Sequence, residues 1–121
     1  ALRAVLARGG IVCLLGERDL RRTGVPVTFF GEPTRMPAGP ARLAVETGAP
    51  LLYAEFWYPD ATSMRVRVHP PIDVSGGIEA GTQAMADAFA EGIARHPADW
   101  HMLQPLWLAD LPAERRARIE D

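Results

Sequence analysis

The sequence predicts an α/β fold, because short apolar runs typical of strands alternate along the chain with segments of helical periodicity. A continuous apolar run fills residues 11–15, and apolar residues alternate with arginine over residues 64–69. Over residues 79–95, apolar residues recur at four-residue spacing. Because a chain of 121 residues has room for one modest core, we expect one domain or a part of one.

The first third of the chain predicts one helical segment and two strands. Residues 1–8 have the composition of the end of a helix. Residues 11–15 lie between glycines, and their unbroken apolar character predicts a strand covered on both faces, with Cys13 buried inside it. Residues 25–30 also favour a strand, but Pro26 restricts it to the edge of a sheet or to an extended loop.

Three further helices are predicted. Residues 40–48 begin with proline and end with glycine, as helix termini prefer. Residues 79–95 form the longest predicted helix, which Pro97 ends, and its apolar face carries Met85, Phe89 and Ile93. A short charged helix is expected at residues 112–119.

An antiparallel hairpin is predicted between the helices. Residues 51–58 are the strongest strand candidate, and the turn-rich residues 59–63 separate them from residues 64–69. In the second strand Met64, Val66 and Val68 alternate with Arg65 and Arg67. This alternation predicts one buried face and one face in water. Residues 73–77 are expected to be a linker.

Composition excludes several classes of function. The net charge is −2, and the 13 basic residues, all arginine, are dispersed, so we expect no nucleic-acid partner. A single cysteine excludes an internal disulfide. No stretch approaches the roughly 18 uncharged apolar residues that span a bilayer. We therefore expect a cytosolic protein, for which membrane contact is possible only from the surface.

One charged triplet is a candidate for chemistry. Glu17, Arg18 and Asp19 directly follow the apolar run at residues 11–15, and open α/β sheets place their active sites at such strand ends. A carboxylate there can orient a histidine base, and an arginine can hold an anionic group. On spacing alone, a charged triplet after a strand is more often a solvated turn.

Two other groups leave the function open. His96, Asp99 and His101 have metal-binding side chains, but the helical zinc motif and a second cysteine are missing, so we predict no metal site. His101 is either a base, a substrate contact or an ordinary surface histidine. The aromatic residues fit a core as well as an acyl-chain tunnel, and they are Phe29, Phe30, Phe56, Trp57, Trp100 and Trp107.

Four segments in a fixed order carry a resemblance to a known family. They read GERDL at 16–20, VTFFGE at 27–32, MPAGPA at 36–41 and HPADWHMLQPLW at 96–107. These segments resemble the bacterial lipid A biosynthesis acyltransferases, and within them the actinobacterial phosphatidylinositol mannoside acyltransferases. The resemblance implies part of a glycerolipid-acyltransferase-like mixed β-sheet flanked by helices. Residues 1–121 are then expected to be the carboxyl-terminal portion of a single acyltransferase domain.

The resemblance implies acyl transfer from acyl-CoA to a sugar hydroxyl of a membrane glycolipid, such as a mannose of phosphatidylinositol mannoside. In this family the histidine of a His-x4-Asp motif is the base. The motif has no match in the 121 residues, so we expect the base upstream and the chain alone to be inactive. Glu17 matches the carboxylate that pairs with this histidine. Arg18 and Asp19 are expected to shape the acceptor site, and Arg35 and His101 to contact substrate.

The resemblance also implies the setting of the reaction. Acyl-CoA is a co-substrate, and no other cofactor and no metal are expected. The whole enzyme is expected at the cytoplasmic face of the plasma membrane as a peripheral protein, where the glycolipid acceptor lies. Two alternatives remain open at this stage: a non-catalytic lipid-binding or interaction module, and an acyltransferase with a lipid A-type acceptor.

Overall fold

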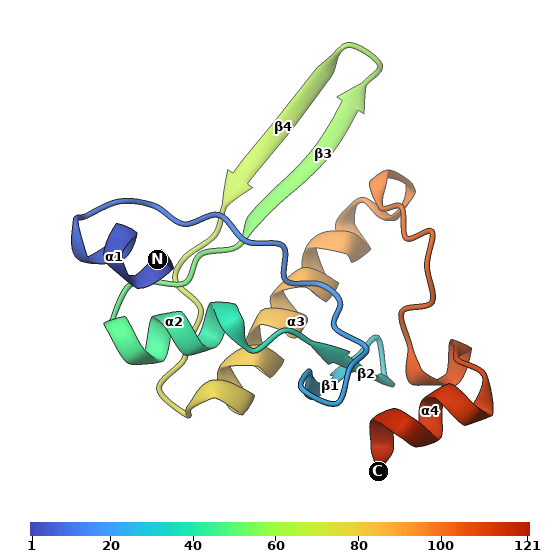
Figure 1. Cartoon of the computed structure of the whole chain (residues 1–121). Helices are drawn as coiled ribbons and strands as arrows, with labels where there is room; N and C mark the ends of the chain where they lie inside the picture. Colours follow the sequence, from blue (N-terminus) through green and yellow to red (C-terminus); the bar gives the residue numbers. More distant parts are fainter.

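The computed structural model describes residues 1–121 and combines helices with two separate two-stranded sheets, which confirms the predicted mixture of α and β structure. Figure 1 shows helix α3 (Ile78–Arg95) crossing the molecule, with the hairpin of residues 54–68 projecting away from the remaining elements. Two short 3-10 turns, Pro97–Asp99 and Leu108–Asp110, follow α3. The helices and strands are α1 Leu2–Ala7, β1 Val25–Phe29, β2 Glu32–Met36, α2 Gly39–Thr47, β3 Ala54–Asp60, β4 Ser63–Val68, α3 Ile78–Arg95 and α4 Ala113–Glu120.

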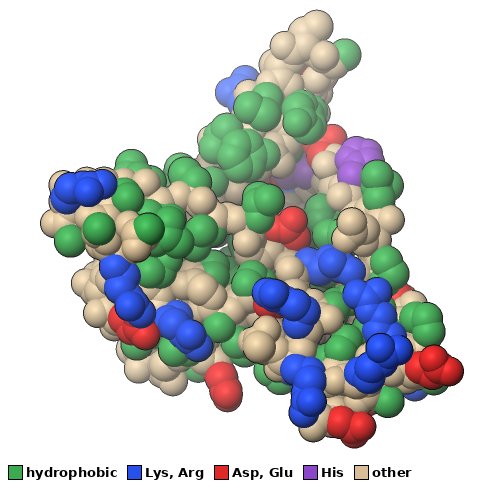
Figure 2. All heavy atoms as spheres, viewed as in Figure 1, with side chains coloured by type: hydrophobic (Ala, Val, Ile, Leu, Met, Phe, Trp, Pro, Cys, Tyr) green, Lys and Arg blue, Asp and Glu red, His purple; other side chains and the backbone are tan.

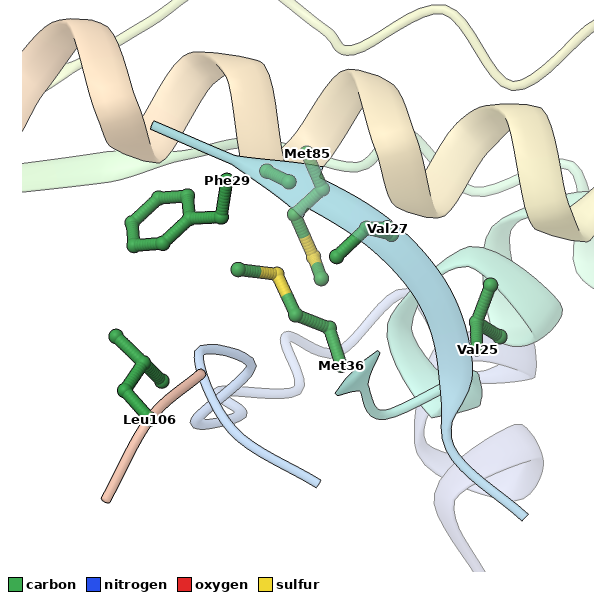
Figure 3. Close-up of a cluster of buried hydrophobic side chains, with 7 residues drawn as sticks. Val25, Val27, Phe29, Met36, Met85 and Leu106 are labelled. Atoms are coloured by element: carbon green, nitrogen blue, oxygen red, sulfur yellow. The ribbon is translucent and has the colours of Figure 1, made fainter. Parts of the chain in front are cut away.

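The core lies between β1 and α3. Alternate residues of β1 point inward, as the period of a strand requires, and Figure 3 shows Met85 of α3 between Val27 and Phe29. Leu106, from the segment after α3, closes the cluster. The buried side chains are Val25, Val27, Phe29, Met36, Met85, Ala86 and Leu106. A second small cluster, of Leu20, Leu111 and Ile119, attaches α4.

Helix α3 is fixed to β1 by polar contacts as well as by packing. The Gln83 side chain accepts a hydrogen bond of 2.9 Å from the backbone N–H of Thr28 and donates one of 2.8 Å to its carbonyl oxygen. The helix ends at Arg95, two residues before Pro97, as predicted. The helices predicted at residues 40–48 and 112–119 are also confirmed within one residue at each end.

The β1–β2 hairpin is only partly predicted by the sequence. Phe30 and Gly31 form its two-residue loop, and both have positive φ, 51° and 78°, as tight hairpin turns require. The strand β1 is confirmed, and Pro26 lies exposed on it. The strand β2 is not predicted, because a strand with Pro33 and charged residues lacks the apolar alternation of a half-buried strand.

The strand predicted at residues 11–15 is wrong. This segment has no regular structure, and the exposed fractions of Ile11 and Leu15 are 86% and 89%. Cys13, predicted to be buried, is exposed. An apolar run becomes a buried strand only where neighbouring strands pair with it, and neither sheet of this structure includes the segment.

The β3–β4 hairpin is confirmed, but the predicted burial of its apolar face is wrong. Phe56 pairs with Val66 and Ala54 with Val68, so these side chains share one face. Phe56 and Val68 are 56% and 62% exposed. The hairpin extends beyond the helices in Figure 1, and Figure 2 shows apolar side chains along it. No helix of the structure is both long enough and apolar enough to cross a membrane.

Candidate functional site

The segment that carries Glu17 begins against helix α3. Gly16 is buried, and a Cβ atom at this position would lie 3.3 Å from Sδ and Cε of Met85 and 3.5 Å from Phe89. A larger residue would therefore push the segment away from the core. The glycine therefore fixes the start of the charged triplet, which is predicted to carry chemistry, against α3.

Two neighbours of Glu17 bind different parts of the fold. The Arg18 Nε–H donates a hydrogen bond of 2.7 Å to the carbonyl oxygen of Pro105. The backbone N–H of Asp19 donates one of 2.9 Å to the carbonyl oxygen of Arg35 in β2. The charged segment thus bridges β2 and the chain that follows α3, which lie far apart in sequence.

Asp19 is buried, and its carboxylate is bound by an arginine of its own loop. Arg21 donates to it from Nε and Nη2 at 2.5 and 3.0 Å. This paired hydrogen bond raises the pKa of the Arg21 guanidinium above its usual value. The buried carboxylate of Asp19 therefore stabilises its own loop through Arg21. That Asp19 also shapes an acceptor site stays a prediction.

Arg35 is held by the turn that precedes β1. Its Nη1 group donates hydrogen bonds of 3.1 Å to the carbonyl oxygens of Arg22 and Gly24. Its Nε–H is buried and has no partner in this structure. The backbone carbonyl of Arg35 accepts a hydrogen bond from the N–H of Asp19, which brings Arg35 beside the charged segment. Its role in substrate binding stays a prediction.

Glu17 itself is partly exposed, and its carboxylate forms no hydrogen bond or ion pair within the chain. Its backbone neighbours are fixed, whereas its carboxylate is open to an incoming group. A carboxylate in this state is suited to accept a hydrogen bond from an imidazole. Its pairing with a catalytic histidine stays a prediction.

An apolar surface depression of about 400 Å³ lies beside the chain that leads to Glu17, and Leu15 is one of its lining residues. The walls come from α1, from the exposed apolar segment after it and from the start of α2. A contact between Arg3 and Glu46 joins the two helices beside it. The apolar lining residues include Leu2, Leu14, Leu15, Pro40 and Leu43.

The segment after α3 brings aromatic residues to the tip of the β1–β2 hairpin. Phe29 lies 6.2 Å from Trp100 and 6.1 Å from Trp107 between ring centroids, and 4.7 Å from Phe30. Phe29 is buried, whereas Phe30 is 46% exposed. His101 follows Trp100 and is exposed. Phe29 therefore belongs to the core and Phe30 to the surface. Both predicted roles of the aromatic residues, core packing and an acyl-chain tunnel, stay open.

A polar cluster that sequence reasoning missed lies at the base of the β3–β4 hairpin. Glu55 is only 2% exposed, and it accepts hydrogen bonds from Arg95 Nη2 at 2.7 Å and Nε at 3.2 Å. His69 Nε2 lies 2.7 Å from the same carboxylate, and His96 Nε2 lies 3.8 Å away. The Arg95 hydrogen bond, followed by His69, lowers the pKa of Glu55 to about 2 despite its burial.

Aromatic rings cover the histidines of this cluster. Tyr53 stacks on His69 with centroids 5.2 Å apart, and Trp57 stacks on His96 at 4.8 Å. Burial raises the pKa of Tyr53, and the nearby Glu55 adds to this shift. Figure 2 shows histidine side chains at the foot of the hairpin. The sequence signal was a lone glutamate inside the most apolar strand, because a charge there needs a partner.

The predicted site residues therefore lie in the region of the charged segment and, for His101, on the segment that follows α3. Glu17, Arg18, Asp19 and Arg35 share one region, which Arg18 joins to the segment carrying His101. The remaining polar cluster, around Glu55, lies at the other end of that same segment.

Comparison with known proteins defines the class of this chain. Residues 1–109 match the family model described as bacterial lipid A biosynthesis acyltransferase. The chain belongs to this family, as its motifs indicated.

Within this family, the chain is similar to individual proteins of known name. The chain is 59% identical, over 94% of its length, to the phosphatidylinositol mannoside acyltransferase of Mycobacterium tuberculosis strain H37Rv, and equally to that of strain CDC 1551. It is 59% identical, over 89% of its length, to the protein of the same name from Mycolicibacterium smegmatis. The chain spans 36% of the length of each of these relatives.

Proposed function

We propose that the whole protein transfers a fatty acyl chain from acyl-CoA to a sugar hydroxyl of a membrane glycolipid, with a mannose of phosphatidylinositol mannoside as acceptor. Family membership and the names of the mycobacterial relatives support acyl transfer to this class of lipid. The observation that carries the proposal is the free carboxylate of Glu17 on a segment fixed at both neighbouring residues.

In the proposed reaction, Glu17 accepts a hydrogen bond from the histidine base that is expected outside these 121 residues. The histidine removes the proton of the sugar hydroxyl, and the oxygen attacks the thioester carbonyl. The carbon–sulfur bond then breaks, and the CoA sulfur leaves with the proton returned by the imidazolium. The negative charge of Glu17 stabilises the imidazolium while it exists.

Other residues are proposed to bind the two substrates. Arg18 uses its Nε–H for Pro105, so its remaining guanidinium N–H groups are available to an anionic or hydroxyl-rich acceptor. His101 and Arg35 are proposed as further polar contacts. The apolar depression before Glu17 offers a surface for part of an acyl chain, because its walls are mainly leucine and proline.

The whole protein is proposed to act as a peripheral protein at the cytoplasmic face of the plasma membrane, where a lipid acceptor is accessible. Flotation of the whole protein with liposomes that contain anionic phospholipid tests this location. Recovery in the floating fraction is expected. Complete recovery in the bottom fraction would contradict a peripheral membrane location.

The activity is tested with the whole protein, radiolabelled palmitoyl-CoA and purified phosphatidylinositol mannoside. We expect labelled glycolipid, and a fall in kcat of about 10²–10⁴-fold for Glu17→Gln. Glu32→Gln is the matched control, because it removes the same charge from an exposed residue of β2. Equal activity of Glu17→Gln and wild type would remove Glu17 from the mechanism. Product with a lipid A-type acceptor alone would correct the acceptor, and binding without any product would favour the lipid-binding module.

A further inference from the structure

We propose that Glu55 is a positioning residue, which holds the start of the 96–107 segment so that Trp100 and His101 lie beside the candidate site. This inference rests on the proposed function for its effect on catalysis. Its structural part stands on contacts of the chain alone.

The first step is the anchoring of α3 to the hairpin. Glu55 belongs to β3 and Arg95 is the last residue of α3, and the two side chains form two hydrogen bonds. His69, directly after β4, binds the same carboxylate. One buried carboxylate therefore joins both strands of the hairpin to the end of the helix.

The second step extends these contacts along the chain that follows α3. The His96 ring lies parallel to Trp57, with an interplanar angle of 3°. The backbone N–H of Tyr58 donates a hydrogen bond of 3.0 Å to Asp99 Oδ2. Residues of β3 thus contact the chain at three successive points, and the direction of the segment is fixed as it leaves the helix.

The third step is the far end of the same segment. The carbonyl oxygen of Pro105 accepts the hydrogen bond from Arg18, and that of Leu106 accepts one from the Thr34 hydroxyl. The segment therefore begins at the Glu55 cluster and ends at the neighbour of Glu17. A change at its start shifts Trp100 and His101 relative to the Glu17 region.

The contacts of Glu55 argue against a catalytic role for Glu55 itself. A carboxylate beside an imidazole is the arrangement of a general base pair. However, Arg95 engages both oxygens of Glu55, and the carboxylate is buried away from solvent. We propose that its effect on the reaction is consequently transmitted through its contacts with Arg95 and His96.

The test compares Glu55→Gln with Glu91→Gln in the whole protein. Glu91 is an exposed acid on α3 whose charge also acts on Arg95, so the control removes a similar charge without breaking the cluster. Indole NMR signals of Trp57, Trp100 and Trp107 are assigned with single Trp→Phe variants. We expect Glu55→Gln to shift the Trp57 and Trp100 signals and Glu91→Gln to leave both in place.

Kinetics supply the second readout, measured well below the unfolding temperature of each variant. We expect Glu55→Gln to lower kcat/KM by about 10- to 100-fold, the scale of a misplacement of about 1 Å. Glu55→Asp keeps the charge, so we expect it to recover part of the lost kcat/KM. If Glu55→Gln does not fold, Glu55→Asp is measured in its place. An unshifted Trp100 signal, or unchanged kcat/KM in a folded variant, would overturn the proposal. If the wild type forms no product, the proposed function fails, and the Trp100 signal still decides the positioning.

Discussion

The indole Nε1–H of Trp107 donates a hydrogen bond of 2.8 Å to the carbonyl oxygen of Phe29, and the two rings stack at 6.1 Å with an angle of 24°. Phe29 is the last residue of β1, where the strand turns into the Phe30 loop. The Trp107 side chain therefore supplies the hydrogen-bond donor for the carbonyl group at the end of β1 and packs against the Phe29 ring.

Replacing Trp107 with Phe keeps an aromatic ring but removes this hydrogen bond. We expect the free energy of unfolding to fall by about 1–2 kcal/mol, because the Phe29 carbonyl loses its partner and some packing is lost. Urea unfolding measures the change. Trp57→Phe is the control, since the Trp57 indole forms no hydrogen bond in the structure. Equal losses of unfolding free energy in Trp107→Phe and Trp57→Phe would show that the smaller ring, and not the missing hydrogen bond, causes the change.

Acid is expected to weaken the Glu55 cluster. The pKa of Glu55 is about 2 in the folded chain, against 4.5 for the free side chain. Because the folded value is the lower one, the contribution to stability is complete above about pH 4.5 and is lost as the pH falls from there towards 2. Arg95, His69 and His96 face this carboxylate.

Urea unfolding at pH 7, 5 and 3 measures the effect. Between pH 7 and pH 3, we expect the free energy of unfolding to fall by on the order of 2 kcal/mol more in wild type than in Glu55→Gln. Glu91→Gln, which leaves the cluster intact, is expected to follow wild type. Parallel pH profiles of wild type and Glu55→Gln would contradict the assigned pKa.

Two glycine substitutions are expected to have opposite effects. A Cβ atom on Gly24 would overlap the carbonyl oxygen of Asp19 and lie 3.0 Å from Cβ of Arg35. Gly24→Ala should therefore cost about 2 kcal/mol or more, because the loop carrying the charged segment must move. A Cβ atom on Gly39, in the first turn of α2, meets nothing within 4 Å.

Gly39→Ala is consequently expected to be neutral or to stabilise by up to about 1 kcal/mol, through helix propensity. Thermal unfolding of the two variants beside wild type measures the difference. A Gly24→Ala protein as stable as Gly39→Ala would show that the Asp19 loop adapts without cost.

The thiol of Cys13 is expected to react readily in the folded 121-residue chain, because the side chain is exposed. With Ellman's reagent, the rate in native buffer should lie within about tenfold of the rate in denaturant. A native rate slower by more than about 100-fold would indicate that the segment at residues 11–15 is covered in solution. The chain has one cysteine, so the signal needs no further assignment.

Local sequence signals predicted the elements whose stability is local. Proline and glycine at the two ends of α2 specify a helix without help from other segments, and Gly48 closes it with φ 74°. The four-residue apolar period predicted α3 for the same reason. Both hairpin strands β3 and β4 followed from composition and the turn between them.

The errors concern features that depend on distant partners. Residues 11–15 are apolar enough for a buried strand, yet strand formation needs a neighbour that sequence periodicity does not reveal. The Glu55 cluster joins residues 40 positions apart in Glu55 and Arg95, and no spacing motif marks it. The charged triplet was identified as a candidate, but its fixation by Pro105 and Arg35 required the structure.

The contacts that place the charged segment span most of the chain, and this determines when they form during synthesis. Arg18 and Pro105 are 87 residues apart, Phe29 and Trp107 are 78 apart, and Thr34 and Leu106 are 72 apart. Contacts of such high sequence separation form late, after the local helices and hairpins. A ribosome-bound chain has both Arg18 and its acceptor only after residue 105 has left the exit tunnel. We therefore expect the surroundings of Glu17 to be completed only after α3 and both hairpins have been synthesised.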